Sequence, residues 1–391
     1  MRANDDSWRL ATILMRASTL SRAPRAPPPR ALTRRRDRHP RAHRARASAS
    51  DDVASLVTLD RALRRIDDER KRQAGASAPW IDVAGARVRA PRGRAWGFVH
   101  FVGGAVLGAY PDVAYDALLT RVADACGVVV VATPYELGTD HDAIARDVRA
   151  MYSRARAEVC EREGLDGRVA PTFRVGHSLG CKVLALSACE DDGDDGGGVV
   201  DVDAASGAIS IAGSNKDDAT AGYFLVAFNN ASASDSVMLI EKFARELLKN
   251  RAGAENSAAF DFLKTLPSIA SFAERAAKAA GFDFKPSPED TLARVRKKFS
   301  ARKTRMLKFT DDELDQNEAL VAALNERFQV YPGTVDTREI EGNHLTPVYF
   351  TLEGSKLSPA LERVVGDFSL GDADGVERLT NALISWILGK D

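Results

Sequence analysis

The sequence is poor in cysteine and has no long apolar run. Only four cysteines occur among 391 residues, and none has the spacing of a metal-binding or redox pair, so we expect reduced thiols and no disulfide framework. The longest stretch without Asp, Glu, Lys or Arg covers residues 95–111, which is too short and too rich in glycine to cross a bilayer. We therefore expect a soluble chain without a transmembrane span. Peripheral contact with a membrane stays open.

The first 50 residues contain 13 arginines, no lysine and three acidic residues. Abundant Arg, Ala, Ser and Pro without an apolar centre are typical of an organelle transit peptide, not of a secretory signal. We assign residues 1–50 to a disordered transit peptide and expect the chloroplast, with the mitochondrion second. A nucleic-acid-binding arm is disfavoured, because the segment has a single aromatic residue, Trp8, and the rest of the chain is acidic.

Strand-like and helix-like segments alternate through most of the remaining chain. Amphipathic helices are predicted at residues 112–126 and 139–163. The strand-like runs are 96–102, 128–132, 173–175, 208–213, 304–309 and 337–340. This alternation predicts an α/β fold whose mostly parallel sheet carries helices on both faces.

Residues 216–302 interrupt that rhythm with a mainly helical pattern and hold nine of the 16 phenylalanines. We interpret them as a helical cap or lid inserted before the penultimate strand, which leaves residues 51–215 and 303–391 as the core. The aromatic side chains serve either the insert's own core or a surface shaped for an acyl substrate. The run at 223–228 is equally compatible with a strand.

Residues 176–180 read Gly-His-Ser-Leu-Gly and lie between a predicted strand and a predicted helix. A serine on so sharp a turn has strained backbone angles, and the small residues at 176 and 180 prevent collisions between neighbouring segments. The turn lifts the serine oxygen clear of the sheet. Ser178 is therefore the candidate nucleophile.

A nucleophilic serine needs a base, and only four histidines lie outside the leader. His100 falls inside an apolar strand, as a core histidine does, and His177 is held in the turn itself and is expected to point away from its neighbour. We interpret His141 as a surface residue at a helix start, with a substrate contact as the alternative. His344, in a turn after the last predicted strand, is the natural base.

The orienting acid is expected in the loop after the strand 304–309. We choose Asp312, because an acid two or three residues past the strand points back toward the histidine; Asp311 and Asp315 are competitors. The same acids would otherwise cap the following helix.

Backbone N–H groups must hold the oxyanion that develops during acyl transfer. We expect them at Leu179, directly after the nucleophile, and at Ala105, after the tight turn at Gly103 and Gly104. No dinucleotide loop of the form Gly-x-Gly-x-x-Gly occurs, and the acidic loop 190–203 lacks the ligand spacing of a calcium site. We expect no cofactor and no metal.

Several short motifs together resemble the domain-of-unknown-function 1350 family, a divergent α/β-hydrolase group of plants, algae and cyanobacteria. The motifs lie at residues 100–105, 132–135, 176–180, 228–230, 284–289, 308–316 and 342–347. The resemblance implies the α/β-hydrolase fold, the positions Ser178, Asp312 and His344 as a triad, and a plastid setting. It implies no substrate.

These observations predict a serine hydrolase that acts on a carboxylic ester or thioester, with an apolar or lipid-like acyl group as one option. The alternative is a catalytically silent α/β-hydrolase-like protein that binds a small ligand or a protein partner in the plastid.

Overall fold

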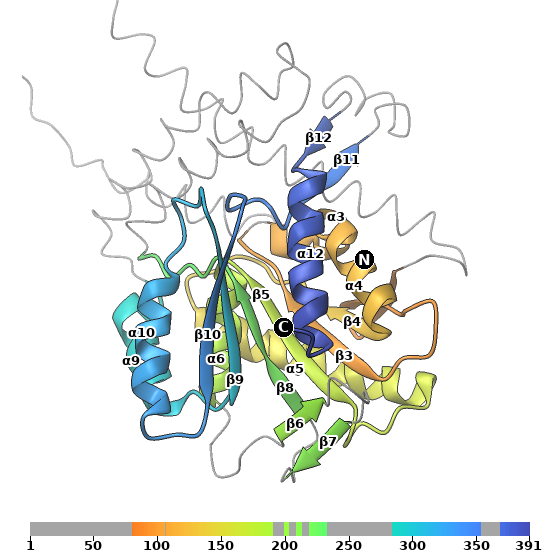
Figure 1. The fold of residues 1–391 in the computed structure, drawn as a ribbon, viewed down its shortest axis with the longest axis horizontal. Helices are drawn as coiled ribbons and strands as arrows, with labels where there is room; N and C mark the ends of the chain where they lie inside the picture. Colours follow the sequence, from red (N-terminus) through yellow and green to blue (C-terminus); the bar gives the residue numbers. More distant parts are fainter. Residues whose placement is uncertain are drawn as a thin grey trace, which may run out of the picture.

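A single mixed sheet of eight strands forms the centre of the molecule. The computed structural model describes residues 80–105, 107–190, 199–202, 209–212, 219–232, 284–352 and 368–391. The strand order is β1-β2-β4-β3-β5-β8-β9-β10 (Figure 1). The strands are β1 (Ile81–Val83), β2 (Ala86–Arg89), β3 (Gly97–Val102), β4 (Val128–Ala132), β5 (Pro171–His177), β8 (Ala219–Val226), β9 (Lys303–Phe309) and β10 (Thr334–Ile340). Strand β2 is antiparallel to both neighbours, and from β4 to β10 every pair is parallel.

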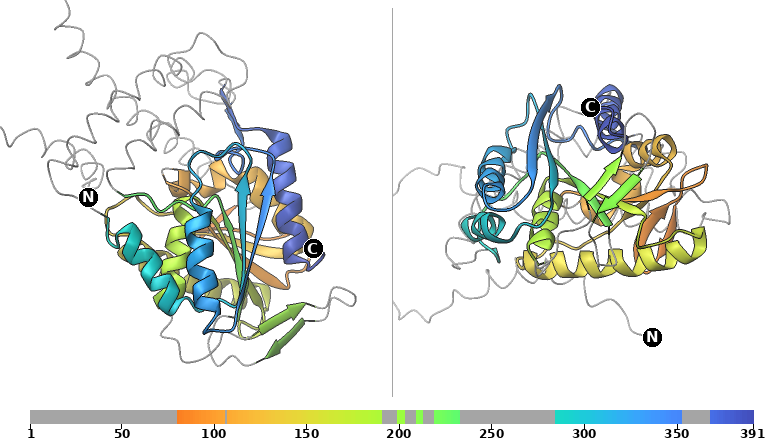
Figure 2. Two further views of the ribbon diagram at one scale, coloured as in Figure 1. Left: turned by 60° about the vertical axis from the view of Figure 1, so that its left-hand side comes forward. Right: turned by 60° about the horizontal axis from the view of Figure 1, so that its bottom comes forward.

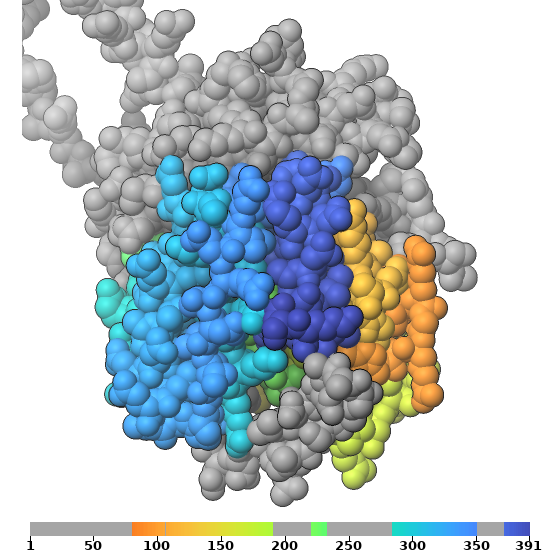
Figure 3. Space-filling model, in the orientation of Figure 1, coloured from red at the N-terminus to blue at the C-terminus, as the bar shows by residue number. Residues whose placement is uncertain are grey.

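Helices cover both faces of this sheet (Figures 1 and 2). One face carries η1 (Leu107–Ala109), α3 (Pro111–Ala114), α4 (Asp116–Cys126) and α12 (Ala373–Ile387). The other carries α5 (His141–Glu163), α6 (Leu179–Glu190), α9 (Pro288–Lys298) and α10 (Asn317–Phe328). In the space-filling view α12, in dark blue, covers the first face beside the strands that end the sheet (Figure 3). None of the helices in these described stretches is long and apolar enough to cross a membrane.

The two faces divide the side chains of the central strand β3. Val99 and Phe101 pack with α4 and α12, whereas Phe98 and Val102 pack on the opposite face with the helices α5 and α6. Successive side chains of a strand point to opposite faces, so a strand covered on both sides must be apolar throughout. The sequence of β3 is nearly continuously apolar because helices cover the strand on both faces. The predicted fold class is confirmed.

Two predicted segments are corrected by the sheet. Residues 208–213 were expected to enter it, but β7 (Ile209–Ala212) pairs with β6 (Val199–Val202) in a separate two-stranded sheet. Strand β6 falls inside the predicted acidic loop. The strand that pairs with β5 in the main sheet is β8, which contains the segment 223–228 that is equally compatible with a strand.

The predicted start of the cap at residue 216 is too early, because β8 is a central strand. At the other end α9 packs against α6 and α10, with Val295 and Phe299 fully buried among core side chains. A smaller hairpin of β11 (Phe350–Leu352) and β12 (Phe368–Leu370) precedes α12. The rest of the predicted cap, residues 233–283, and the predicted transit peptide lie outside the described residues.

Candidate active site

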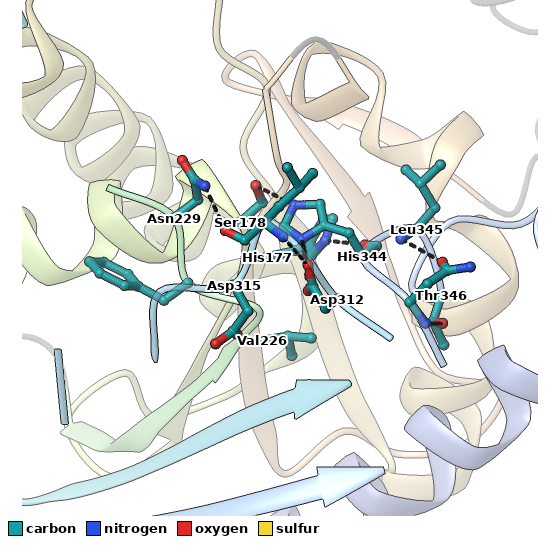
Figure 4. Close-up of polar contacts among 12 residues, drawn as sticks. His177, Ser178, Val226, Asn229, Asp312, Asp315, His344, Leu345 and Thr346 are labelled. Carbon is teal, nitrogen blue, oxygen red and sulfur yellow. Dashed lines mark hydrogen bonds and ion pairs between the residues drawn. The ribbon is translucent and has the colours of Figure 1, made fainter. Parts of the chain in front are cut away.

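Three side chains that are distant in the sequence meet at the carboxyl edge of the parallel strands. Ser178 directly follows β5, Asp312 lies three residues past β9, and His344 lies four residues past β10. Parallel strands end at one edge of their sheet, so the loops that follow them converge there. Figure 4 shows the three residues side by side, joined by hydrogen bonds.

The backbone at Ser178 has the left-handed conformation that the pattern predicted. Its φ is 55°, and its N–H donates to the carbonyl oxygen of Val226 at 2.9 Å, so the turn is held against β8. A Cβ at Gly180 would collide with the carbonyl oxygen of Val102, and one at Gly176 would lie 3.0 Å from the Cys181 backbone. The two glycines are therefore required by the close approach of the helix and the strands.

The imidazole of His344 bridges the serine and the carboxylate. Its Nε2 lies 2.8 Å from Ser178 Oγ, and its Nδ1 lies 2.8 Å and 3.0 Å from the two Asp312 carboxylate oxygens. An ionised carboxylate only accepts hydrogen bonds, so Nδ1 carries the proton and Nε2 is free to accept from the serine hydroxyl. Ser178 is 8% exposed and His344 3%, which keeps most water from this chain of hydrogen bonds.

The structure distinguishes the three candidate acids. Asp311 is exposed, and its N–H donates to the carbonyl oxygen of Gly342. Asp315 accepts from the Asn317 N–H, and its carboxylate points away from the His344 ring (Figure 4). Burial, together with the nearby Asp312 charge, raises the pKa of Asp315 to about 6. Only Asp312 among them contacts the imidazole.

The glycine turn after β3 packs directly against the serine. A Cβ at Gly104 would lie 3.1 Å from Ser178 Cβ, which is tighter than an ordinary van der Waals contact, so glycine favours this approach. Two tyrosines hold the turn: Tyr115 Oη accepts from the Gly104 N–H at 2.9 Å, and Tyr135 Oη donates to the Gly103 carbonyl oxygen at 2.9 Å.

The two predicted oxyanion donors are the backbone N–H groups of Leu179 and Ala105. In the described part of the chain, neither the Leu179 N–H nor the Ala105 N–H donates to a protein acceptor. The Gly104 N–H, in contrast, is used by Tyr115. Among the described residues, the predicted Ala105 amide therefore has no competing bond.

The loop that carries His344 is shaped by its own side chains. The Asn343 N–H donates to Thr346 Oγ1 at 2.8 Å, and Asn343 Oδ1 accepts from the Leu345 N–H at 3.0 Å. These short-range hydrogen bonds take the place of the backbone hydrogen bonds of regular secondary structure. They turn the chain sharply at the histidine. The Asn-His-Leu-Thr motif thus has a local structural reason.

Two other histidines are buried away from the serine. His100 accepts a hydrogen bond from Arg174 at Nδ1 and contacts Thr133 at Nε2, as expected for a core residue; burial lowers its pKa. His141 was predicted at the surface, but it is 2% exposed and packs on the ring of Phe284. Burial lowers its pKa to about 4. The segment around Phe284 covers the start of α5, which local sequence does not reveal.

Three residues beside the triad, His177, Asn229 and Tyr115, have no role that the local sequence indicates. His177 Nε2 lies 2.9 Å from the carbonyl oxygen of His344, and its Nδ1 lies 2.9 Å from Tyr115 Oη. The Asn229 N–H donates to the Ser178 carbonyl oxygen at 3.4 Å, and its side chain donates to Leu314 at 2.9 Å. Asn229 lies within a motif that carried the family resemblance. No local pattern marks Tyr115.

No metal-binding arrangement is present in the described ranges. No group of three or more His, Cys, Asp or Glu side chains there is placed so that it could hold a metal ion, and the four cysteines form no disulfide. What these ranges do contain is a serine, an imidazole and a carboxylate joined by hydrogen bonds. That arrangement is suited to acyl transfer.

Solved structures with a similar fold include several esterases. An esterase from Pyrobaculum calidifontis has 13% sequence identity and a TM-score of 0.46, with 87% of this chain and 93% of that chain covered. An esterase from Rhizomucor miehei has 14% identity and a TM-score of 0.41, with coverage of 80% and 83%. The Francisella virulence factor BioJ has 13% identity and a TM-score of 0.44, with coverage of 88% and 95%.

The strand order, the turn after β5 and the mostly parallel sheet define an α/β-hydrolase fold. A comparison with curated proteins finds no match. A family model described as "Protein of unknown function (DUF1350)" matches residues 79–206 and 208–387, which is most of the chain. The chain therefore belongs to the DUF1350 family.

Proposed function

We propose that the protein is a serine hydrolase that cleaves a carboxylic ester or thioester through an acyl-enzyme. One observation carries the proposal: His344 Nε2 lies 2.8 Å from Ser178 Oγ while its Nδ1 is bonded to Asp312. This geometry activates a hydroxyl, because the imidazole can remove its proton as the new bond forms.

In the proposed first step, Ser178 Oγ attacks the substrate carbonyl carbon and its proton moves to His344 Nε2. Asp312 stabilises the imidazolium that results without taking its proton. The carbonyl oxygen becomes an oxyanion, which the Leu179 and Ala105 N–H groups hold. His344 then gives its proton to the leaving alcohol or thiol, and the carbon–oxygen or carbon–sulfur bond breaks.

The second step returns the enzyme to its starting state. A water molecule attacks the acyl carbon while His344 removes one of its protons, and the same two amides hold the second oxyanion. The proton then returns to Ser178 Oγ as the acid product leaves. The neighbouring His177 is not a rival base, because burial lowers its pKa to about 3.

The proposed acyl group is apolar, and this part depends on aromatic residues of the insert. Phe224, Phe228 and Phe299 are fully buried in the core, so they explain part of the aromatic enrichment without a substrate. The five that lie outside the described residues are Phe243, Phe260, Phe262, Phe272 and Phe282. A series of p-nitrophenyl esters of increasing chain length tests the preference: kcat/KM should rise with length, whereas a flat series contradicts it.

A fluorophosphonate probe tests the proposed activity. Labelling of the wild type is expected, with none in Ser178→Ala and a strong reduction in His344→Ala, since the probe reacts with an activated serine. Asp311→Ala is a matched surface control that should label normally. A folded wild type that is not labelled would favour the alternative, a silent protein that binds a ligand or partner.

We further propose a plastid location, with residues 1–50 as the transit segment. A fluorescent fusion of these residues should enter the chloroplast, and a fusion that stays in the cytosol or enters mitochondria would contradict the assignment.

A further inference from the structure

A directed chain of hydrogen bonds joins the glycine turn to the loop of the proposed base. The Gly104 N–H donates to Tyr115 Oη at 2.9 Å. Tyr115 Oη lies 2.9 Å from His177 Nδ1, and His177 Nε2 lies 2.9 Å from the His344 carbonyl oxygen. Tyr115 is fully buried and His177 is 3% exposed, so water does not compete for these bonds.

The atoms at the two ends determine the direction of every bond in this chain. A carbonyl oxygen only accepts, so His177 Nε2 must carry a proton. In the neutral imidazole Nδ1 then accepts, and Tyr115 donates to it. The tyrosine oxygen in turn accepts from Gly104. One tautomer of His177 therefore satisfies all four groups.

The protonated imidazole fits this site poorly. With both nitrogens protonated, Tyr115 Oη would receive two donors, and its own proton would lose its acceptor at Nδ1. The His177 ring also lies 5.1 Å from the His344 ring, centroid to centroid. A second positive charge there would oppose the imidazolium that forms on His344 during acyl transfer. A neutral His177 avoids that repulsion.

We propose that Tyr115 and His177 are positioning residues that form a strut between the oxyanion turn and the main chain of His344. The strut holds the base in line with Ser178 and fixes the turn that presents the Ala105 amide. This role rests on the proposed hydrolase function. Neither residue touches the reacting atoms, so each acts through the groups that it orients.

The tautomer of His177 tests the strut without any substrate. In the full-length protein labelled with ¹⁵N in its histidine rings, long-range ¹H–¹⁵N spectra should show His177 as the neutral Nε2–H form from about pH 5 to 8. His177→Gln assigns the signal. An Nδ1–H tautomer, or a ring that takes up a proton in this range, overturns the proposal.

Kinetics of paired variants test the positioning role. Tyr115→Phe should lower the fluorophosphonate labelling rate and the kcat for a p-nitrophenyl ester about 10-fold, with KM unchanged, since only the approach to the transition state is affected. Tyr152→Phe is the matched control: it removes a buried hydroxyl that bonds Thr172 on the other face of the sheet. Equal losses in the two variants overturn the strut.

Rescue separates positioning from packing. His177→Gln keeps an N–H donor near the position of Nε2 and should retain most of the activity. His177→Leu has no such donor, so it should lose at least as much activity as Tyr115→Phe does. In the His177→Gln background, the further substitution Tyr115→Phe should lower the activity little, because glutamine has no tautomer for the tyrosine to fix. Equal loss in the glutamine and leucine variants, both folded by circular dichroism, overturns the strut. An unreactive wild type overturns the hydrolase function instead, and the positioning role with it.

Discussion

His344 Nε2 lies 2.8 Å from Ser178 Oγ, although 166 residues separate the two in the chain. The contact exists because β5 and β10 end at the same edge of the sheet and because local bonds turn the His344 loop back over the serine. Substitutions of residues that contact this pair, or that shape the turn at Ser178, test its geometry.

Asp312→Asn should lower kcat about 10³- to 10⁴-fold with little change in stability. The amide can donate to Nδ1, which favours the wrong imidazole tautomer and leaves Nε2 unable to accept from Ser178. Steady-state hydrolysis of a p-nitrophenyl ester measures the loss. Asp315→Asn is the matched control and should stay within about threefold of the wild type; a larger loss for Asp315→Asn than for Asp312→Asn would assign the acid to Asp315.

Ser178→Gly should be more stable than Ser178→Ala by about 1 kcal/mol in the free energy of unfolding. The reason is the φ of 55° at this position, which strains any residue with a Cβ and which glycine adopts freely. Urea denaturation of the two variants measures the difference, and both should resist the fluorophosphonate. Equal stability would show that the turn is unstrained.

Gly180→Ala should destabilise the protein by about 2 to 4 kcal/mol. A Cβ there would collide with the carbonyl oxygens of Val102 and Gly103, which are main-chain atoms and cannot rotate away. Gly93→Ala is the control, since nothing lies within 4 Å of a Cβ at that exposed glycine. Thermal unfolding of both variants gives the comparison; similar melting temperatures would contradict the close approach.

The protein should lose stability as the pH falls below about 6.5, partly because its buried histidines must remain neutral. Burial lowers the pKa of His177 to about 3 and that of His141 to about 4. In the unfolded chain each histidine has a higher pKa, about 6.5, so the unfolded state binds the proton more tightly. The free energy of unfolding therefore falls as the pH drops from the unfolded pKa to the folded pKa, by about 2 kcal/mol per histidine at pH 5.

Urea denaturation at pH 7.5 and at pH 5 measures this dependence. His177→Gln removes one of these titrating groups, so the difference in unfolding free energy between the two pH values should shrink by about 2 kcal/mol. An unchanged difference would mean that His177 is not a buried neutral imidazole.

Local patterns were sufficient for most of the sheet and for the turn at the serine. The apolar runs of β3 and β4 reflect burial on both faces, and the glycines at 176 and 180 reflect steric contact, so each leaves a mark within a few residues. Local patterns did not predict which of β7 and β8 joins the main sheet. Both runs are apolar enough for a strand, and the choice of the partner beside β5 depends on packing between distant segments.

The sequence by itself determined the kinds of residue available, the chain order Ser178, Asp312, His344, and the strained turn, because sterics and periodicity act over a few residues. Only the tertiary structure decided that Asp312 faces the imidazole while Asp311 and Asp315 do not, and that His177 bonds to the His344 main chain. These contacts join residues 32 and 167 positions apart. Their geometry depends on where whole strands end, and no local pattern contains that information.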